Sequence, residues 1–223
     1  MTTHSLRRKH RGLSLVEVLI AVGILAVVSL ASVTAMLAAG RMSRSAVEDV
    51  MALEFVNRQT ELMRSSRIYS NLGVTEYTGT QTFQYDPASF GASTAPVFTI
   101  NYEWYGFGTV TGSTGTSISF DDSDWPSDVD FTGHRCLLRP TGLGTSAAIA
   151  NITDHSDGTF TTDSAFNGWN QTDWEFAVPA GMYFEVDGGK WCRMTVTWET
   201  GTGRSRTYTR TVFVPWRQDP TLN

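Results

Sequence analysis

Residues 7–20 read RRKHRGLSLVEVLI, and this junction between a basic and an apolar segment decides the fold of the chain. The basic part ends at Gly12, and the apolar part runs from Leu13 to Gly40 with Glu17 as its one charged residue. An ionised carboxylate in membrane hydrocarbon costs about 3 kcal/mol on insertion scales. Glu17 therefore needs a compensating interaction.

The apolar segment 13–40 is long enough to cross a bilayer. It contains 28 residues, whereas about 20 helical residues span the hydrocarbon core. Because basic residues precede it, we expect one membrane pass with the amino terminus in the cytoplasm and the remainder outside the inner membrane. A secretory signal peptide cleaved near Val33-Thr34-Ala35 is the alternative, although such peptides have an apolar core about half as long.

The charge of the chain is unevenly distributed. Residues 1–12 carry four basic and no acidic side chains, and the remainder carries 13 basic and 22 acidic ones, a formal charge of −9. Removal of the leader would leave an acidic protein. This argues against nucleic acid as the main partner, because nucleic-acid binding relies on cations that contact phosphates.

The junction resembles the processing site of type IV prepilins and of the pseudopilins of type II secretion. In that family a basic leader is cleaved after the glycine, the new amino terminus is methylated, and the fifth mature residue is a glutamate. The resemblance implies that a prepilin peptidase cleaves after Gly12, that Leu13 is methylated, and that Glu17 is the fifth mature residue. It also implies that Glu17 neutralises the amino terminus of a neighbouring subunit and sets the axial register. A glutamate that is merely tolerated in the headgroup region is the alternative.

One continuous helix is predicted from Ser14 to about residue 70. This stretch lacks proline, and its only glycines are Gly23 and Gly40. A helix of about 55 residues is about 80 Å long at about 1.5 Å per residue. In its second half we expect an apolar stripe that packs partly on a small domain. The stripe comprises Val47, Val50, Met51, Phe55, Leu62, Ile68 and Tyr69.

The sequence after residue 70 predicts strands separated by turns rich in Gly, Ser, Thr and Asp. Residues 97–104 and 191–198 alternate between apolar and polar, which is typical of strands with one buried face. Residues 206–214 are expected to form a hairpin with 191–198. Shorter strands are expected at 117–120, 135–139 and 182–186, and irregular loops at 86–95 and 142–170.

The predicted fold class is therefore α+β, with a pilin-like amino-terminal helix (about residues 14–70) packed on a carboxy-terminal antiparallel sheet. Four segments are expected along the chain. They are a basic leader (1–12), a transmembrane or filament-core half of the helix (13–40), an amphipathic half (41–70) and a β-rich head (71–223).

Cys136 and Cys192 lie beyond the apolar segment, on the oxidising side of the membrane in the predicted orientation. A disulfide between them would stabilise the head by about 4 kcal/mol in the chain-entropy model. The sequence thus predicts a bridge, and two reduced, buried cysteines are the alternative.

Other polar groups carry weaker signals. Asp121, Asp122 and Asp124 are calcium candidates because carboxylate oxygens suit this cation, but a solvated acidic turn is the favoured interpretation, and no cofactor is expected. His134 and His155 have no nucleophile placed by a recognisable motif, so no enzyme activity is expected.

The predicted function is a structural one: a minor pilin of a bacterial type IV pilus-like filament, first held in the inner membrane and then assembled in the periplasm or at the cell surface. Its expected partners are other pilin or pseudopilin subunits, the prepilin peptidase and methyltransferase, and the inner-membrane assembly platform. The alternatives are a type II secretion minor pseudopilin and an adhesin head that binds glycans through Trp125, Trp169 or Trp174.

Overall fold

The computed structural model describes residues 14–66, 69–84, 96–139, 148–164, 180–200 and 203–216. The chain divides into two compact units, residues 1–47 and 48–223. Helix α1 (Leu15–Ser65) begins in the first unit and ends in the second, where a short 3₁₀ turn, η1 (Tyr69–Asn71), follows it. The predicted helix is confirmed over 51 residues, and it ends about five residues earlier than expected.

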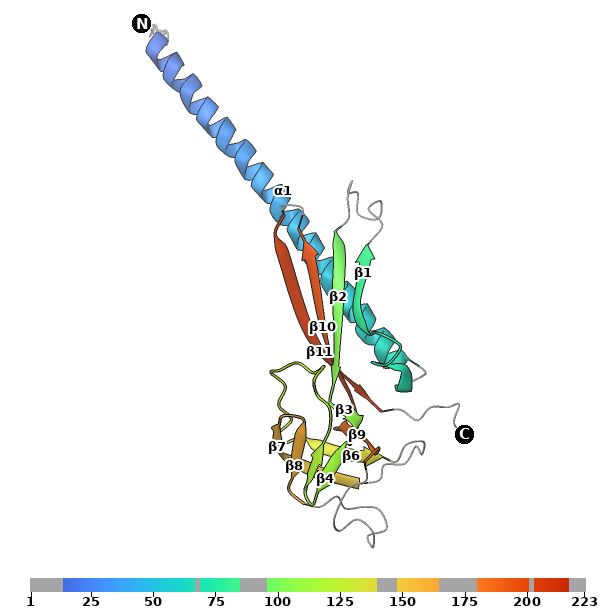
Figure 1. Cartoon of the computed structure of the whole chain (residues 1–223). Helices are drawn as coiled ribbons and strands as arrows, with labels where there is room; N and C mark the ends of the chain where they lie inside the picture. The colour runs from blue at the N-terminus through green and yellow to red at the C-terminus, as the bar shows by residue number, and fades with distance from the viewer. Residues whose placement is uncertain are drawn as a thin grey trace, which may run out of the picture. The chain divides into compact units, whose positions relative to one another are not determined.

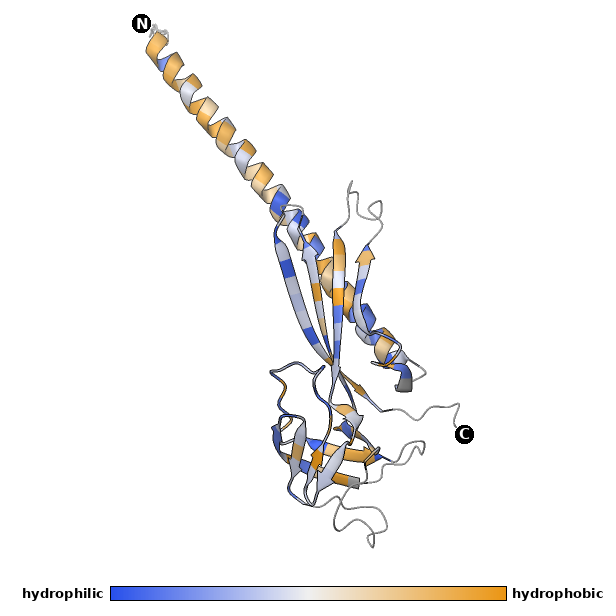
Figure 2. Ribbon diagram, in the orientation of Figure 1, coloured by the Kyte–Doolittle hydropathy of each residue, from blue (hydrophilic) through white to orange (hydrophobic). Residues whose placement is uncertain are grey.

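From Leu15 to Gly40, α1 is apolar on all sides apart from Glu17, as the hydropathy colouring of Figure 2 shows. The side chains from Leu15 to Gly40 are all exposed. Two hydroxyls are satisfied within the helix itself, because Ser32 Oγ donates to Val28 O at 2.8 Å and Thr34 Oγ1 donates to Ala31 O at 2.9 Å. Such internal bonds let small polar residues lie in an apolar helix without open donors.

In the second unit, one face of α1 is buried against the sheet. Met51, Phe55 and Met63 belong to this face, as the sequence predicts for the first two. Val50, however, is 62% exposed and Leu62 is 43% exposed, so the predicted stripe is partly wrong. The buried positions are centred about half a turn away from Val50. Hydropathy alone could not distinguish the two sides, because both carry apolar residues.

The sheet is antiparallel throughout its named pairs, which confirms the predicted α+β class (Figure 1). The strand order is β1-β2-β10-β9-β6-β7-β8-β5-β4, with β11 on β10 and β3 on β9. The bounds are β1 Gly79–Gln84, β2 Val97–Tyr105, β3 Phe107–Thr109, β4 Gly112–Thr114, β5 Ser117–Ser119, β6 Arg135–Arg139, β7 Ala148–Ser156, β8 Thr159–Thr162, β9 Tyr183–Val186, β10 Gly189–Glu199 and β11 Ser205–Pro215.

The predicted long strands and their hairpin are confirmed. β10 pairs with β11 from Gly189↔Pro215 to Glu199↔Ser205. β2 and β10 alternate between buried and half-buried residues, as expected for strands with one face on a core. The prediction of an irregular loop over 142–170 is wrong for residues 148–162, where β7 and β8 form a bulged pair. Their mixed Thr, Asp and Asn sequence hides the alternation. The loop predicted at 86–95 lies outside the described residues.

The second unit contains two hydrophobic cores. The first joins α1 to β2, β10 and β11, and we call these elements with η1 and β1 the helix lobe. The second core lies among β3 to β9, residues 107–186, which we call the insert lobe because it interrupts the chain between β2 and β10. Buried side chains of the helix lobe include Val56, Phe98, Ile100, Met194 and Val196, and those of the insert lobe include Ile118, Leu138, Ile152, Phe160 and Phe184.

Candidate processing and assembly site

The described chain begins at the apolar side of the predicted processing junction. Gly12 and Leu13 lie outside the described residues, as do the basic residues before them. Ser14 and Glu17 are described and form a reciprocal cap on α1. Ser14 N donates to Glu17 Oε2 at 3.0 Å, and Glu17 N donates to Ser14 Oγ at 3.3 Å. This arrangement is a capping box, in which two open amide donors at a helix start are satisfied.

The capping box is a feature that our sequence reasoning missed. The signal was present, because Ser14-Leu-Val-Glu17 has the Ser-x-x-Glu spacing of the motif. The carboxylate also lies in the first turn of α1, where negative charge interacts favourably with the helix dipole. Glu17 therefore has a local role at the helix start, in addition to any role between subunits.

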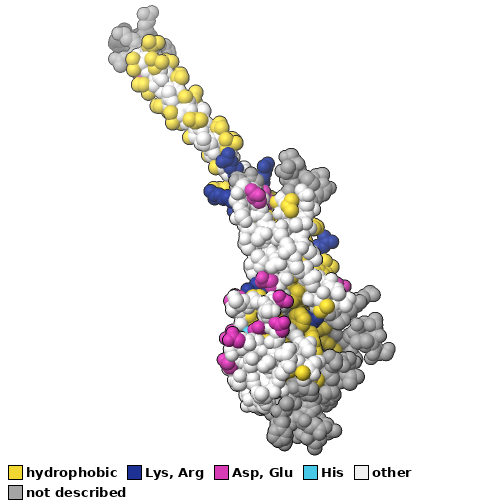
Figure 3. All heavy atoms as spheres, viewed as in Figure 1, with side chains coloured by type: hydrophobic (Ala, Val, Ile, Leu, Met, Phe, Trp, Pro, Cys, Tyr) yellow, Lys and Arg dark blue, Asp and Glu magenta, His cyan; other side chains and the backbone are white. Residues whose placement is uncertain are grey.

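The helix that follows this cap has the length and composition of a membrane span. Within the described residues, α1 is the one helix with these properties, and none of its apolar window is buried. Figure 3 shows hydrophobic side chains along this part of α1 and acidic side chains gathered on the second unit. An apolar surface of this extent needs cover from lipid or from other protein chains.

The calcium candidates lie in the loop between β5 and β6. Asp121 Oδ1 accepts a hydrogen bond from Ser123 N at 3.0 Å, and Asp122 Oδ2 accepts one from Gly158 N at 2.8 Å. These carboxylates fix turns of the backbone. Among the described residues, no group of three or more metal-ligating side chains is brought together.

The predicted disulfide is absent, and Cys136 and Cys192 are free, buried thiols. Cys136 lies opposite Val186 on β9, and Val186 lies opposite Gly189 on β10, three residues before Cys192. Two strand spacings of about 4.8 Å and three residues of strand thus separate the cysteines, whereas a bridge needs Cα atoms within about 7 Å. Burial raises the pKa of both thiols, which keeps them protonated and unreactive.

The two described histidines have structural contacts. His134 Nδ1 lies 2.7 Å from Asp187 Oδ2, and the other oxygen of Asp187 accepts a hydrogen bond from Arg135 N at 3.1 Å. His155 packs among the aromatic rings of the insert lobe, with its ring centroid 5.0 Å from that of Phe160. Among the described residues, neither set of contacts includes a hydroxyl or thiol nucleophile.

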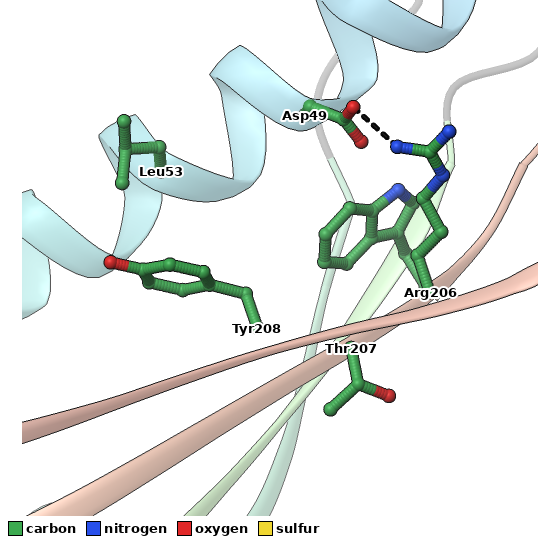
Figure 4. Close-up of a pocket in the computed structure, with 6 residues that line it drawn as sticks. Asp49, Leu53, Arg206, Thr207 and Tyr208 are labelled. Atoms are coloured by element: carbon green, nitrogen blue, oxygen red, sulfur yellow. Dashed lines mark hydrogen bonds and ion pairs between the residues drawn. The ribbon is translucent and has the colours of Figure 1, made fainter.

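A shallow groove of about 340 Å³ lies beside α1 and the β10–β11 hairpin (Figure 4). An ion pair between Asp49 and Arg206 borders it, and both side chains are nearly half exposed. Exposed pairs of this kind contribute about 0–1 kcal/mol. The described lining residues of the groove do not form an arrangement of an acid, a base and a nucleophile. Its lining residues are Asp49, Leu53, Trp198, Arg206, Thr207 and Tyr208.

Trp125 is the one tryptophan among the three glycan-binding candidates that lies within the described residues. Trp125 is half-buried, and its ring packs against Phe120 at a centroid distance of 5.1 Å and against Phe131 at 5.9 Å. It therefore contributes to the insert-lobe core. Trp169 and Trp174 lie outside the described residues.

Comparison with known proteins supports the amino-terminal site. Residues 7–33 match the prokaryotic N-terminal methylation motif. This match and the long apolar amino-terminal helix support a type IV pilin-like protein. Proteins with this motif are structural, assemble with other pilin subunits and are processed by a prepilin peptidase. No curated protein and no solved structure shows significant similarity to the chain.

Proposed function

We propose that this chain is a minor pilin, a structural subunit of a bacterial type IV pilus-like filament. The precursor is held in the inner membrane with its amino terminus in the cytoplasm and its head outside. Prepilin peptidase cleaves after Gly12, Leu13 is methylated, and the subunit then enters a filament in the periplasm or at the cell surface. The observation that carries this proposal is the methylation motif at residues 7–33, continued by an apolar helix with no buried side chains up to Gly40.

Glu17 acts at two levels in this proposal. Within its own chain it accepts a hydrogen bond from Ser14 N through Oε2. A carboxylate has two oxygens, so it can keep this cap while it meets a cation. The cation is the amino terminus of a neighbouring mature subunit, and attraction between the two charges is strong where water is excluded. This pairing sets the axial register of subunit addition.

The test of processing is mass spectrometry of the mature amino terminus in filament-enriched fractions, with and without the prepilin peptidase. We expect a chain that begins with methylated leucine from position 13. A chain that retains Met1, or one that begins near residue 36, would show that the amino-terminal cation never forms beside Glu17.

Three variants separate the charge of Glu17 from its capping role. Glu17→Gln keeps an acceptor for Ser14 N but removes the charge, Glu17→Ala removes both, and Ser14→Ala removes only the hydroxyl half of the cap. We expect normal processing in all three, strongly reduced incorporation into filaments for both Glu17 variants, and nearly normal incorporation for Ser14→Ala. Normal incorporation of Glu17→Gln would exclude the register role.

A type II secretion minor pseudopilin is the second candidate, because the same motif serves both systems. The two are distinguished by deleting the gene and measuring surface pili and protein secretion in parallel. Loss of secretion with intact pili would assign the chain to the secretion system. An adhesin head delivered on a pilin helix would instead lose glycan or surface binding when Trp169 or Trp174 is replaced, with filaments unchanged.

A further inference from the structure

The insert lobe is joined to the helix lobe by two short backbone crossings. One runs from Tyr105 to Phe107 through Gly106, whose φ is +76°. The other runs from Val186 to Gly189 through Asp187 and Gly188, at φ values of 56° and 72°. Two crossings of this kind define a hinge axis. One backbone pair, Val186 with Gly189, also joins β9 to β10 across this junction. Side chains on either side of the axis supply the other contacts that can fix the angle between the lobes.

On the side of the sheet that faces α1, a buried ammonium group contacts the chain segment after the helix. Lys190, the second residue of β10, is 2% exposed. Its Nζ donates to Leu72 O at 2.7 Å and to Tyr69 O at 3.4 Å. The same atom lies 4.6 Å from the ring centroid of Phe107, the first residue of the insert lobe. Lys190 therefore contacts both lobes at their junction.

A buried carboxylate of the insert lobe also contacts the helix lobe. Glu185 on β9 is fully buried, and its Oε1 accepts a hydrogen bond from the Tyr69 hydroxyl of the helix lobe at 2.8 Å. Its Oε2 lies 3.2 Å from Arg139 Nε of the insert lobe, close enough for an ion pair but without the alignment of a hydrogen bond. The Arg139 guanidinium lies 4.2 Å from the ring centroid of Trp216, which follows β11.

On the opposite side of the sheet the contacts between the lobes are aromatic rings, with Phe131 buried and Trp191 half-buried, and one ion pair. The ring centroids of Trp191 and Phe131 lie 6.3 Å apart. Arg193 Nη1 pairs with Asp128 Oδ1 at 2.6 Å, but the Asp128 side chain is 69% exposed. Exposed pairs contribute little, and ring contacts tolerate sliding better than directed bonds do. The buried cluster is thus the more directional of the two contacts.

The buried cluster contains two basic groups and one acidic group, and burying charged groups costs free energy unless they are paired. Buried ion pairs are often no more stable than apolar replacements, but in some proteins they specify a single conformation. We propose that Lys190, Glu185 and Arg139, with the Tyr69 hydroxyl, form an ionic joint that fixes the angle of the insert lobe against the helix lobe. Lys190 is a positioning residue: it holds carbonyl groups on one lobe while it packs on the other.

The proposal is tested by measuring the distance between the lobes in the full chain in detergent micelles. Spin labels are attached at cysteines introduced at Thr82 on β1 and Thr114 on β4, both exposed. The native cysteines are buried and remain unlabelled in the folded chain. We expect one narrow distance distribution in this background. We then add Lys190→Met, which leaves the Glu185–Arg139 ion pair in place. This variant should increase the width of the distance distribution at least about twofold.

Arg193→Met is the matched control, because it removes an ion pair between the same lobes on the opposite, exposed side. We expect its distribution to equal that of the unmodified background. Tyr69→Phe removes a single hydroxyl from the joint and should broaden the distribution less than Lys190→Met does, so it provides a milder second variant. An unchanged distribution in both joint variants, or equal broadening in Arg193→Met, would overturn the proposal.

Discussion

Raising the pH above 8 should stabilise the folded chain through Lys190. Burial lowers the pKa of this ammonium group to about 8, and Glu185 offsets only part of that effect. In the unfolded chain a lysine has a pKa of about 10.4. Between these two values the unfolded chain holds a proton that the folded chain has released, so the free energy of unfolding rises with pH in this window.

The size of the effect follows from the same two values. At about 1.36 kcal/mol for each pH unit, the interval from about 8 to about 10.4 corresponds to about 3 kcal/mol. Below pH 8 both states hold the proton, and the folded state bears the full cost of the buried charge. Lys190→Met removes that cost but leaves Leu72 O without its donor, at about 1–3 kcal/mol. Near neutral pH we therefore expect the variant to be about as stable as the natural chain.

Denaturant unfolding of the full chain in micelles, followed at several pH values between about 7 and 10.5, provides the measurement. The natural chain should gain about 3 kcal/mol relative to Lys190→Met across this range. The comparison is specific, because Lys9 and Lys190 are the only lysines in the sequence and Lys9 lies in the leader. Tyrosine ionisation affects both chains alike. A difference between the two chains that stays constant with pH would refute the assignment of Lys190 as a buried cation.

Three further outcomes are expected. Met63→Ala should lower the free energy of unfolding by about 2–4 kcal/mol, because Met63 is fully buried between α1 and the sheet; a loss below about 1 kcal/mol would contradict the docking of this helix face. Gly189→Ala should destabilise the chain by about 2 kcal/mol or more, because a Cβ there would lie 2.5 Å from a backbone carbonyl oxygen of β11. Gly112 has open space around it, so Gly112→Ala should leave the free energy of unfolding nearly unchanged in the same denaturation assay. Without reductant, a thiol reagent should label Cys136 and Cys192 only after unfolding. A chain that stays unlabelled when unfolded would show that the two cysteines form a disulfide.

The sequence predicted the features that depend on local pattern. The junction at residues 7–20 and the absence of proline after Ser14 led to the helix and to the pilin-like class. The alternation in 97–104 and 191–198 led to two central strands, because a strand with one buried face has a period of two. Capping by Ser14 and Glu17 was equally local and could have been predicted from the Ser-x-x-Glu spacing.

The features that the sequence left open are those in which distant residues meet. Which side of α1 packs on the sheet depended on the side chains that the sheet presents to Met51 and Val50. The number and location of the two cysteines predicted a disulfide, but the register across β6, β9 and β10 keeps them apart.

The sequence by itself determined that this is a pilin-like chain with an apolar helix, since charge and hydropathy act on neighbouring residues. Only the tertiary structure decided that Lys190 is a buried group rather than a solvated one. Its partner Leu72 O is 118 residues away along the chain, and no local pattern can encode a contact that forms only when two strands and a helix end come together.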